Sequence, residues 1–431
     1  MNPEAAFLDA AVWYGPLDQA AEILAAHAEI ASRSIYTAAI LGDEAGVRRF
    51  LGADAAGATS KGGPRGWDAL TYLCFSKYLR LEPARSEGFV RAAEALLNAG
   101  ANPNTGFYDA EPQPDPAFES VLYGAAGVAH HAGVTRVLME RGADPNDGEV
   151  PYHSPEGYDD RALQVLVESG KVTAESLVTM LCRKHDWHDY EGIRWLLEHG
   201  ADPKRVTRWR RTAFHQALLR DNSLEIIELL LDHGGNPALA AGGVSAIGLA
   251  ARRGRGDVLD LFERRGIAIN LEGVERLAAA CARHAKTGAE PQALAELKAR
   301  GGQFLAEFAG NGNTEGVRFL LDLGIDAGAL FEEGDPYWDV ARNSTGLHVA
   351  AWRARHDTVK FLITRGAPVN ALDAKGRTAL ALAVRACVDS YWSARRSPES
   401  VAALLAAGAS VSGISLPSGY AEVDALLHTQ E

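Results

Sequence analysis

The chain has 431 residues and a formal net charge of −13, because 56 Asp and Glu outnumber 43 Lys and Arg. This acidity argues against a protein that binds nucleic acid through a broad positive field. No run of 18 apolar residues occurs, so no membrane span is expected. The first ten residues lack a basic region followed by an apolar run, so no signal peptide is expected.

One short motif recurs along the chain: an apolar stretch, a glycine and then small or acidic residues. In chain order its copies include ALLNAGANPN, VLMERGADPN, WLLEHGADP, LLLDHGGNP and FLITRGAPVN. The closing glycines are Gly100, Gly142, Gly200, Gly234, Gly266, Gly324, Gly366 and Gly408. A motif that recurs in this way indicates a solenoid of stacked units, which has no single core and no single catalytic pocket.

Residues 345–370 illustrate how one unit is built. Thr345 can cap a first helix, and Leu347 belongs to its apolar face. Leu362 belongs to the buried face of a second helix, and Gly366 supplies the left-handed residue that ends it. The predicted unit is a helix, a short turn, a second helix and a projecting hairpin. Such a unit cannot bury its own faces, so it must stack on its neighbours.

This unit resembles an ankyrin repeat, whose pattern runs from a Thr-Pro-Leu-His turn through two helices to a Gly-Ala-Asp turn. Residues 373–384 match the first half of that pattern, and residues 212–237 match nearly all of it. The proline that follows the capping threonine in the family is absent here. The resemblance implies an all-α ankyrin-repeat solenoid of helix-turn-helix units with short hairpin loops. It also implies a structural hydrogen bond for His215 and for His348.

About twelve units fit this template. They begin near Ala5, Ser34, Asp68, Ser120, Gly157, Glu175, Thr212, Ser245, Glu275, Gln303, Thr345 and Thr378. The fifth, around Arg161 to Gly170, is short, so whether it is a true repeat stays open. The third, sixth, ninth and twelfth units have longer turns between their helices. We expect one continuous array over residues 1–431, with a polar capping helix at residues 418–431.

Motifs of catalysis are almost absent from the sequence. The four cysteines lie far apart in buried-looking positions near the ends of first helices, which predicts core thiols in a reducing compartment. Gly310, Gly312 and Gly316 are spaced like glycines of a nucleotide-binding loop. No strand precedes them, so we interpret them as part of the turn between two helices. We expect no cofactor and no enzymatic activity.

One cluster leaves a chemical alternative open. Residues 182–192 contain His185 and His188, and two histidines three positions apart on a helix can share one metal ion. No third or fourth ligand follows at a suitable spacing. The favoured interpretation is therefore an enlarged polar turn capped by an aspartate, with no metal bound.

The distribution of charge points to a binding surface. Residues 180–266 carry a net charge of +2, whereas the rest of the chain carries −15. Within this window a predicted hairpin tip gathers basic side chains around one tryptophan. We expect this stripe to receive an acidic segment of a protein partner. The alternative is that its charged side chains are simply solvated and bind no partner. The candidate residues are Lys204, Arg205, Arg208, Trp209, Arg210 and Arg211.

Three long hairpins are predicted to have the opposite character. Residues 107–119, 149–160 and 332–339 combine acidic residues with aromatic rings. Exposed aromatic side chains anchor many protein interfaces, although these rings could instead pack on the next hairpin. The candidate anchors are Tyr108, Tyr152, Tyr158, Tyr337 and Trp338.

These observations predict a cytoplasmic, non-catalytic scaffold that binds a protein partner through hairpin tips and the concave helix face. Arg outnumbers Lys by 34 to 9, which is typical of GC-rich genomes and favours a bacterial source. Two alternatives stay open. One is an enzyme or metal-binding protein with a site near His185 and His188. The other is nucleic-acid binding through the basic stripe 204–211.

Overall fold

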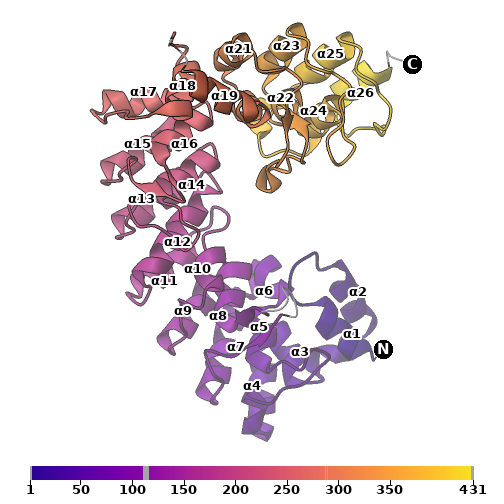
Figure 1. Cartoon of the computed structure of the whole chain (residues 1–431). Coiled ribbons are helices and arrows are strands. Elements are labelled where there is room, and N and C mark those ends of the chain that lie inside the picture. The colour runs from indigo at the N-terminus through magenta and orange to yellow at the C-terminus, as the bar shows by residue number, and fades with distance from the viewer. Residues whose placement is uncertain (1, 110–115, 287, 289, 429–431) are drawn as a thin grey trace. The chain divides into compact units, whose positions relative to one another are not determined.

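The computed structural model describes residues 2–109, 116–286, 288 and 290–428. Its internal contacts divide the chain into two compact units, here called unit 1 (residues 1–236) and unit 2 (residues 237–431). In both units a first helix is followed by a short turn and a second helix, and this arrangement repeats along the chain (Figure 1). The predicted all-α solenoid is confirmed.

Unit 1 contains seven such pairs within the described residues, together with short helical turns. The first helices are α1 (Pro3–Ala10), α3 (Ile35–Ile40), α5 (Ala69–Cys74), α8 (Val121–Tyr123), α10 (Glu149–His153), α12 (Ala174–His185) and α14 (Ala213–Leu219). The second helices are α2 (Asp18–Ala26), α4 (Glu44–Ala53), α7 (Ser86–Asn98), α9 (Ala132–Glu140), α11 (Arg161–Glu168), α13 (Tyr190–Glu198) and α15 (Leu224–Asp232). The additional turns are η1 (Ala28–Ser32), η2 (Ala55–Ala58), α6 (Lys77–Leu81), η3 (Pro83–Arg85) and η4 (Gly124–Val128).

Unit 2 repeats the arrangement. Its first helices are α16 (Ala246–Arg252), α18 (Gly273–Ala282), α20 (Gly301–Asn311), α22 (Gly346–Trp352) and α24 (Ala379–Val388). Its second helices are α17 (Gly256–Arg264), α19 (Pro291–Ala299), α21 (Thr314–Asp322), α23 (His356–Thr364) and α25 (Glu399–Ala406). Two short turns, η5 (Pro336–Trp338) and η6 (Ser393–Arg395), and the last helix, α26 (Ala421–His428), complete the unit. The predicted capping helix is therefore present up to His428, and residues 429–431 lie outside the described part.

Short antiparallel hairpins connect some of the pairs. In unit 1, β1 (Gly106–Tyr108) pairs with β2 (Phe118–Ser120). In unit 2, β3 (Ala240–Ala241) pairs with β4 (Val244–Ser245), and β5 (Leu330–Phe331) pairs with β6 (Ser344–Thr345). Residues 110–115 of the predicted hairpin 107–119 lie outside the described residues.

Polar caps and glycines set the ends of the helices. The side chain of Asp68 accepts a hydrogen bond from the Thr71 amide at 2.9 Å, and Thr378 caps α24 in the same way. At the other end, Gly200 follows α13 with φ +94°, a conformation that a side chain would strain. The first helices then stack on one another, as α10, α12 and α14 do in unit 1 and α20, α22 and α24 do in unit 2.

His348, the histidine of the repeat motif, makes the structural hydrogen bond that the resemblance implied, and it also joins neighbouring repeats. The Nδ1 atom of His348 accepts a hydrogen bond from the Thr345 amide at 3.1 Å. Its Nε2 atom donates to the carbonyl oxygens of Ala371 and Arg377 at 3.0 and 3.1 Å, in the loop of the next repeat. Burial lowers the pKa of His348, so the ring stays neutral and links two repeats as donor and acceptor at once. The Nδ1 atom of His215 likewise accepts a hydrogen bond from the Thr212 amide at 3.4 Å, and it lies 2.7 Å from the Thr212 hydroxyl.

The fifth unit begins earlier than the sequence indicated. The prediction placed its start near Gly157 and treated residues 149–160 as a protruding hairpin. In the structure α10 forms the first helix of this pair, and Asp147, one residue before its N-cap Gly148, accepts a hydrogen bond from the Val150 amide at 2.9 Å. The five-residue α10 contains a proline, so no helical period was visible in the sequence. The total number of repeats, like the continuity of the array, stays a prediction.

All four cysteines are free thiols in the cores of the two units, in α5, α12, α18 and α24. Burial raises the pKa of Cys182 and that of Cys281 to about 12, and it also raises the pKa of Cys74 and Cys387. These thiols behave as small apolar core residues, as predicted.

Candidate partner-binding surface

In unit 1, polar and aromatic side chains form a row of contacts along the C-terminal ends of successive first helices. Near the start of the row, the Tyr14 and Tyr123 hydroxyl oxygens lie 3.1 Å apart, and the Tyr123 ring lies 5.1 Å from the His153 ring. The row continues through Arg183 at the end of α12 to Arg220 at the end of α14. Tyr14, beside the first pair, contacts Tyr123 of the fourth pair, and the later members contact a neighbouring pair, so the repeats present one connected surface here.

His153, the last residue of α10, is held between two carboxylates. Its Nε2 atom lies 3.2 Å from Glu149 and its Nδ1 atom 2.9 Å from Glu156. Burial alone would lower the pKa of His153, but the hydrogen bonds to the two glutamates outweigh it and raise that pKa to about 9. His153 is therefore a cation at neutral pH, and its position at a helix C-terminus suits that charge.

Arg183 connects this triad with the next repeat. Its Nη2 atom donates to Glu156 at 2.9 Å, and its Nε atom donates to the Tyr152 carbonyl at 3.1 Å. The guanidinium lies 4.0 Å from the centre of the Tyr152 ring, a cation–π contact. These contacts fix the orientation of the Tyr152 ring.

Asp186 joins α12 to α14. Its side chain is only 4% exposed, and it accepts hydrogen bonds from Arg220 Nε and Gln216 Nε2, each at 2.6 Å. Arg183 forms a further ion pair with the same carboxylate. A buried carboxylate that binds two guanidinium groups is favourable only while all partners remain. Asp186 therefore sets the positions of both arginines.

The loop after α13 adds an exposed ring to this row. Thr207 is buried and its amide donates to the Arg211 carbonyl at 2.8 Å, which closes the loop, and Arg210 has φ +57°. The closed loop places the Trp209 ring 5.7 Å from the Tyr152 ring, and Trp209 is 37% exposed. The Arg208 guanidinium lies 4.7 Å from the Trp209 ring.

We call this set the Trp209 stack; it consists of Arg183, Tyr152, Trp209 and Arg208. The sequence predicted three of its members as site residues but did not predict that Tyr152 would meet Trp209. Arg183 was not among the candidates. The sequence feature that could have identified it is its position at the end of a first helix, one repeat after an aromatic residue.

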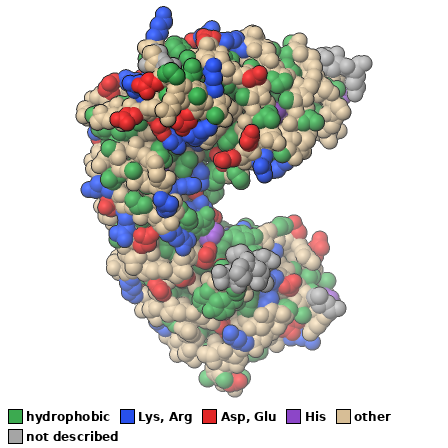
Figure 2. Space-filling model, viewed as in Figure 1, with side chains coloured by type: hydrophobic (Ala, Val, Ile, Leu, Met, Phe, Trp, Pro, Cys, Tyr) green, Lys and Arg blue, Asp and Glu red, His purple; other side chains and the backbone are tan. Residues whose placement is uncertain are grey.

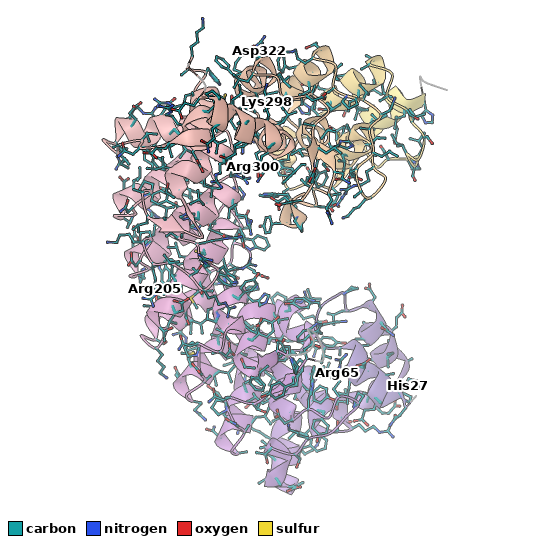
Figure 3. All side chains as sticks on the ribbon, viewed as in Figure 1. His27, Arg65, Arg205, Lys298, Arg300 and Asp322 are labelled. Carbon is teal, nitrogen blue, oxygen red and sulfur yellow. The ribbon has the colours of Figure 1, made fainter. Side chains whose placement is uncertain are left out.

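The other basic candidates surround the stack. Arg205, labelled in Figure 3, pairs with Glu175 at 3.2 Å, and Arg211 donates to Gln216 at 3.3 Å. Lys204, Arg208 and Arg210 are exposed, and within the described residues none of them lies within 4.0 Å of a carboxylate. The loop therefore presents cations without neutralising partners beside an exposed indole ring.

The remaining tyrosine candidates of unit 1 lie outside the stack. Tyr108, on β1, is exposed and contacts Phe118 at 5.1 Å. Tyr158 is also exposed; its ring lies 6.0 Å from the Trp187 ring and its hydroxyl donates to the Trp187 carbonyl at 3.0 Å. These rings pack on neighbouring residues of unit 1, and the structure does not bring them to the Trp209 stack.

Trp338 is not an exposed anchor, which corrects the prediction. It is 2% exposed and packs on Trp392 at 5.2 Å. The Trp352 indole donates to the Trp338 carbonyl at 2.6 Å, and the Arg353 guanidinium lies 5.4 Å from the Trp338 ring. The loop between β5 and β6 folds back over the helix ends, so this ring belongs to the core of unit 2. Its neighbour Tyr337 remains 37% exposed.

The histidine cluster has structural partners. His185 is buried, its Nδ1 atom donates to the Leu181 carbonyl at 2.7 Å, and burial lowers its pKa to about 4. His188 lies 3.3 Å from the Asn222 amide. As predicted, Asp189 caps the following helix by accepting the Gly192 amide. In the described part of the chain, no three His, Cys, Asp or Glu side chains are placed to hold a metal ion.

Charged side chains of both signs are interspersed over the face of the molecule in Figure 2. The described helices include none that is both long and apolar enough for a membrane span.

Comparisons with known proteins agree with the repeat architecture. A family model for ankyrin repeats (3 copies) matches residues 179–273 and 304–412. No match was found among curated proteins. The ankyrin repeat domain of human ASB11 is 19% identical, with 58% of this chain and 97% of that one covered and a TM-score of 0.27. The ankyrin repeat domain of Bcl-3, described as a unique member of the IkappaB protein family, is 20% identical, with 57% and 97% covered and a TM-score of 0.26.

Similarities at these TM-scores add nothing to the assignment, which depends on the family model and on the repeated motif. The matched residues include the Thr212 and Thr345 units, in which the Thr–His hydrogen bonds are formed. Residues 179–273 and 304–412 of this chain are therefore ankyrin repeats.

Proposed function

We propose that the chain is a non-catalytic module that binds a protein partner through the Trp209 stack. The observation that supports this is an exposed indole ring held against a fixed tyrosine and flanked by cations that lack ion-pair partners among the described residues. Ankyrin repeats are generally protein-interaction modules, and tryptophan, tyrosine and arginine are the residue types that contribute most to interface affinity.

The geometry favours binding because the side chains of the stack are already held in place and lose little conformational entropy when a partner binds. Arg183 is bound to Glu156, Asp186 and the Tyr152 carbonyl, so the Tyr152 ring cannot reorient freely. Trp209 rests on that ring, and its exposed part offers apolar area at little conformational cost.

The chemistry of the surroundings indicates what the partner carries. Lys204, Arg208 and Arg210 are exposed around the indole ring. A partner segment that combines an apolar side chain with nearby carboxylates matches this surface. The opposite charges would accelerate association, and an apolar contact with Trp209 would slow dissociation.

The test uses the full chain as bait in extracts of the cells that encode it. We would compare the wild type with Trp209→Ala and with Arg208→Glu. Tyr391→Ala is the matched control, because Tyr391 is a 72% exposed ring in unit 2. A protein retained by the wild type and the control but lost by both loop variants is then purified, and its binding kinetics are measured.

We expect Trp209→Ala to raise the dissociation rate at least tenfold, the size of a typical anchor residue. Arg208→Glu is expected to lower mainly the association rate and to reduce its dependence on salt. Unchanged kinetics in both variants, with unchanged circular dichroism, would reject the Trp209 stack as the binding surface.

The same measurements address the two alternatives from the sequence. Saturable binding of DNA that disappears with Arg208→Glu would support the nucleic-acid alternative. A melting temperature lowered by a chelator in the wild type, but not in His188→Ala, would support the metal alternative. The described structure provides no specific observation in favour of either.

We also propose that residues 1–431 form one continuous array. In such an array each repeat is stabilised by its neighbours. Residues 237–431 expressed alone should then unfold at a lower urea concentration than the same unit within the full chain. Equal midpoints for the two would indicate that the units are independent.

A further inference from the structure

Unit 2 contains an open cavity of about 460 Å³ that the preceding proposal does not use. It lies beside the turns that join α20 to α21 and α22 to α23, and beside the segment 394–399 that leads into α25. Gly312, from the motif spaced like a nucleotide-binding loop, forms part of its wall. The long turn of the twelfth unit supplies the opposite wall.

Three arginines line this cavity: Arg355, Arg395 and Arg396. In the described part of the chain none of the three lies within 4.0 Å of a carboxylate. Nearby Arg255 differs, because it forms a bidentate ion pair with Asp257 at 2.9 Å. The cavity therefore collects guanidinium groups whose charge the protein leaves unbalanced.

The acidic groups at the cavity do not neutralise these arginines. Glu399 lines it but pairs with Lys360 at 2.6 Å. Asp357 also lines it, but the charge of this one carboxylate is smaller than the summed charge of the three guanidinium groups. The lining keeps a net positive charge, and it adds the hydroxyl groups of Thr314 and Thr358, whose oxygen atoms lie 2.7 Å apart.

Burial and mutual repulsion act on two of these cations. Burial, followed by the charge of Arg255, lowers the pKa of Arg355 to about 10. Burial, followed by the charge of Arg355, lowers the pKa of Arg395 to about 9. Both groups remain protonated at neutral pH, so the fold tolerates an electrostatic cost that a bound anion would remove.

The arginine side chains are held in place by the repeat itself. Arg355 Nε donates to the Gly310 carbonyl at 2.9 Å, and the stem passes so near Gly312 that a Cβ there would lie 2.9 Å from Arg355 Cδ. His356 holds the wall that contains Arg395, because its ring nitrogens bind Ser400 Oγ at 2.7 Å and the Arg395 carbonyl at 2.9 Å. The site is thus organised before any ligand arrives.

The backbone supports the same charge preference. Arg355 occupies the N-cap position of α23, and its side chain makes no capping hydrogen bond. The first amides of this nine-residue helix therefore have no side-chain acceptor from the cap, and a helix N-terminus attracts anions.

We propose that this cavity binds a phosphate-class dianion, held by Arg355 and Arg395 with Arg396 at its mouth. Guanidinium groups bind tetrahedral oxyanions through pairs of parallel hydrogen bonds, and two or three of them balance a double negative charge. The volume exceeds what one phosphate fills, so the dianion is one end of a larger group. Its source is either a free phosphorylated metabolite or a phosphorylated side chain of a protein, and this site is independent of the Trp209 stack.

The test is calorimetric titration of the full chain at constant ionic strength. The probes are inorganic phosphate, ribose 5-phosphate and N-acetyl-O-phosphoserine amide, with chloride as the reference anion. We expect one equivalent of phosphate to bind, and Arg355→Gln and Arg395→Gln each to weaken binding about tenfold or more. Arg264→Gln is the matched control, because Arg264 is exposed on α17 and lies away from the cavity lining.

Arg396→Gln provides a variant at an exposed position in case a buried substitution disturbs folding, and circular dichroism checks each protein. Tighter binding of the phosphoserine probe assigns the source to a protein, and tighter binding of the sugar phosphate assigns it to a metabolite; either supports the site. The proposal is overturned if phosphate binds no better than chloride, or if all three cavity variants bind it as well as Arg264→Gln does.

Discussion

The two units carry similar side chains beyond the ends of first helices and use them differently. In unit 1, Arg183 lies on Tyr152, and the loop residue Trp209 adds a ring that is 37% exposed. In unit 2, Arg353 lies 5.4 Å from the ring of the loop residue Trp338, which is 2% exposed. A contact between an arginine and an aromatic ring near the ends of first helices can thus be a surface feature or part of a core.

The connections of each loop explain the difference. The unit 2 loop is clamped by Asp339, which pairs with Lys375 at 2.5 Å and with Arg377 at 2.9 Å and also with Arg385. These partners belong to the next repeat, so the loop is pulled over the helix ends. In unit 1 the bond between Thr207 and the Arg211 carbonyl closes the loop on itself, and Trp209 stays at the surface.

The largest expected effect separates the two tryptophans. Trp338→Ala removes a fully buried ring, so the free energy of unfolding should fall by about 3–5 kcal/mol. Trp209→Ala removes a partly exposed ring and should cost about 1 kcal/mol or less. Urea unfolding followed by circular dichroism measures both. Similar losses for the two variants would mean that the contrast between the loops is wrong.

A second comparison concerns the two carboxylates that bind several cations. Asp186→Ala leaves Arg183 and Arg220 without their buried partner, so unfolding should become easier by about 3 kcal/mol. Asp339 is 30% exposed, and its replacement by Ala should cost about 1 kcal/mol because water screens the freed cations. Urea titrations of both variants under one buffer give the comparison, and a larger loss for Asp339→Ala would contradict it.

The pH dependence of unit 1 should follow His153. Its pKa is raised to about 9, so the folded state holds the proton more tightly than the unfolded state. This stabilisation is fully present below about pH 6.5 and is lost as pH rises through 9, amounting to about 3 kcal/mol. His153→Gln should flatten the curve of unfolding free energy between pH 6.5 and 9.5.

A second group in unit 1 titrates below that window. Burial, helped by the nearby Glu149, raises the pKa of Glu119 to about 7. The stabilisation that this protonated carboxyl provides is fully present below about pH 4.5, the pKa of the group in the unfolded chain, and it is lost as pH rises through 7. The unfolding free energy that is lost between pH 7.5 and 9.5 should therefore come from His153. An unchanged slope of the His153→Gln curve over this range would contradict that assignment.

The smallest effect is expected at exposed ion pairs in both units. Arg205→Ala breaks the pair with Glu175, and Arg365→Ala breaks the 2.7 Å pair with Asp322. Each should change the unfolding free energy by no more than about 0.5 kcal/mol, because both side chains of each pair are solvated. A loss above about 1 kcal/mol at either site, measured by urea unfolding, would place that residue in a tighter network than its exposure indicates.

The sequence predicted the features that depend on neighbouring residues along the chain. Capping residues such as Asp68 and Thr378 and closing glycines such as Gly200 lie at helix ends, because caps and left-handed turns are local requirements. The Thr345–His348 contact followed from the family motif. The short α10 was missed because five residues show no helical period.

The contacts of the candidate site could not be predicted in the same way. The meeting of Tyr152 with Trp209 joins residues far apart in sequence and depends on how a loop closes. The burial of Trp338 depends on a clamp formed by side chains of the following repeat. Loop conformation depends on such long-range contacts, so the sequence identified which rings and cations matter but not which of them are exposed.

The four buried thiols give the chain its own set of probes for partial opening. Cys74 and Cys182 lie in unit 1, and Cys281 and Cys387 lie in unit 2, each in a different first helix. Because each thiol is buried and burial also raises its pKa, reaction with a thiol reagent requires the local helix pair to open. The modification rate at each cysteine would therefore report how the solenoid frays from repeat to repeat, without any engineered label.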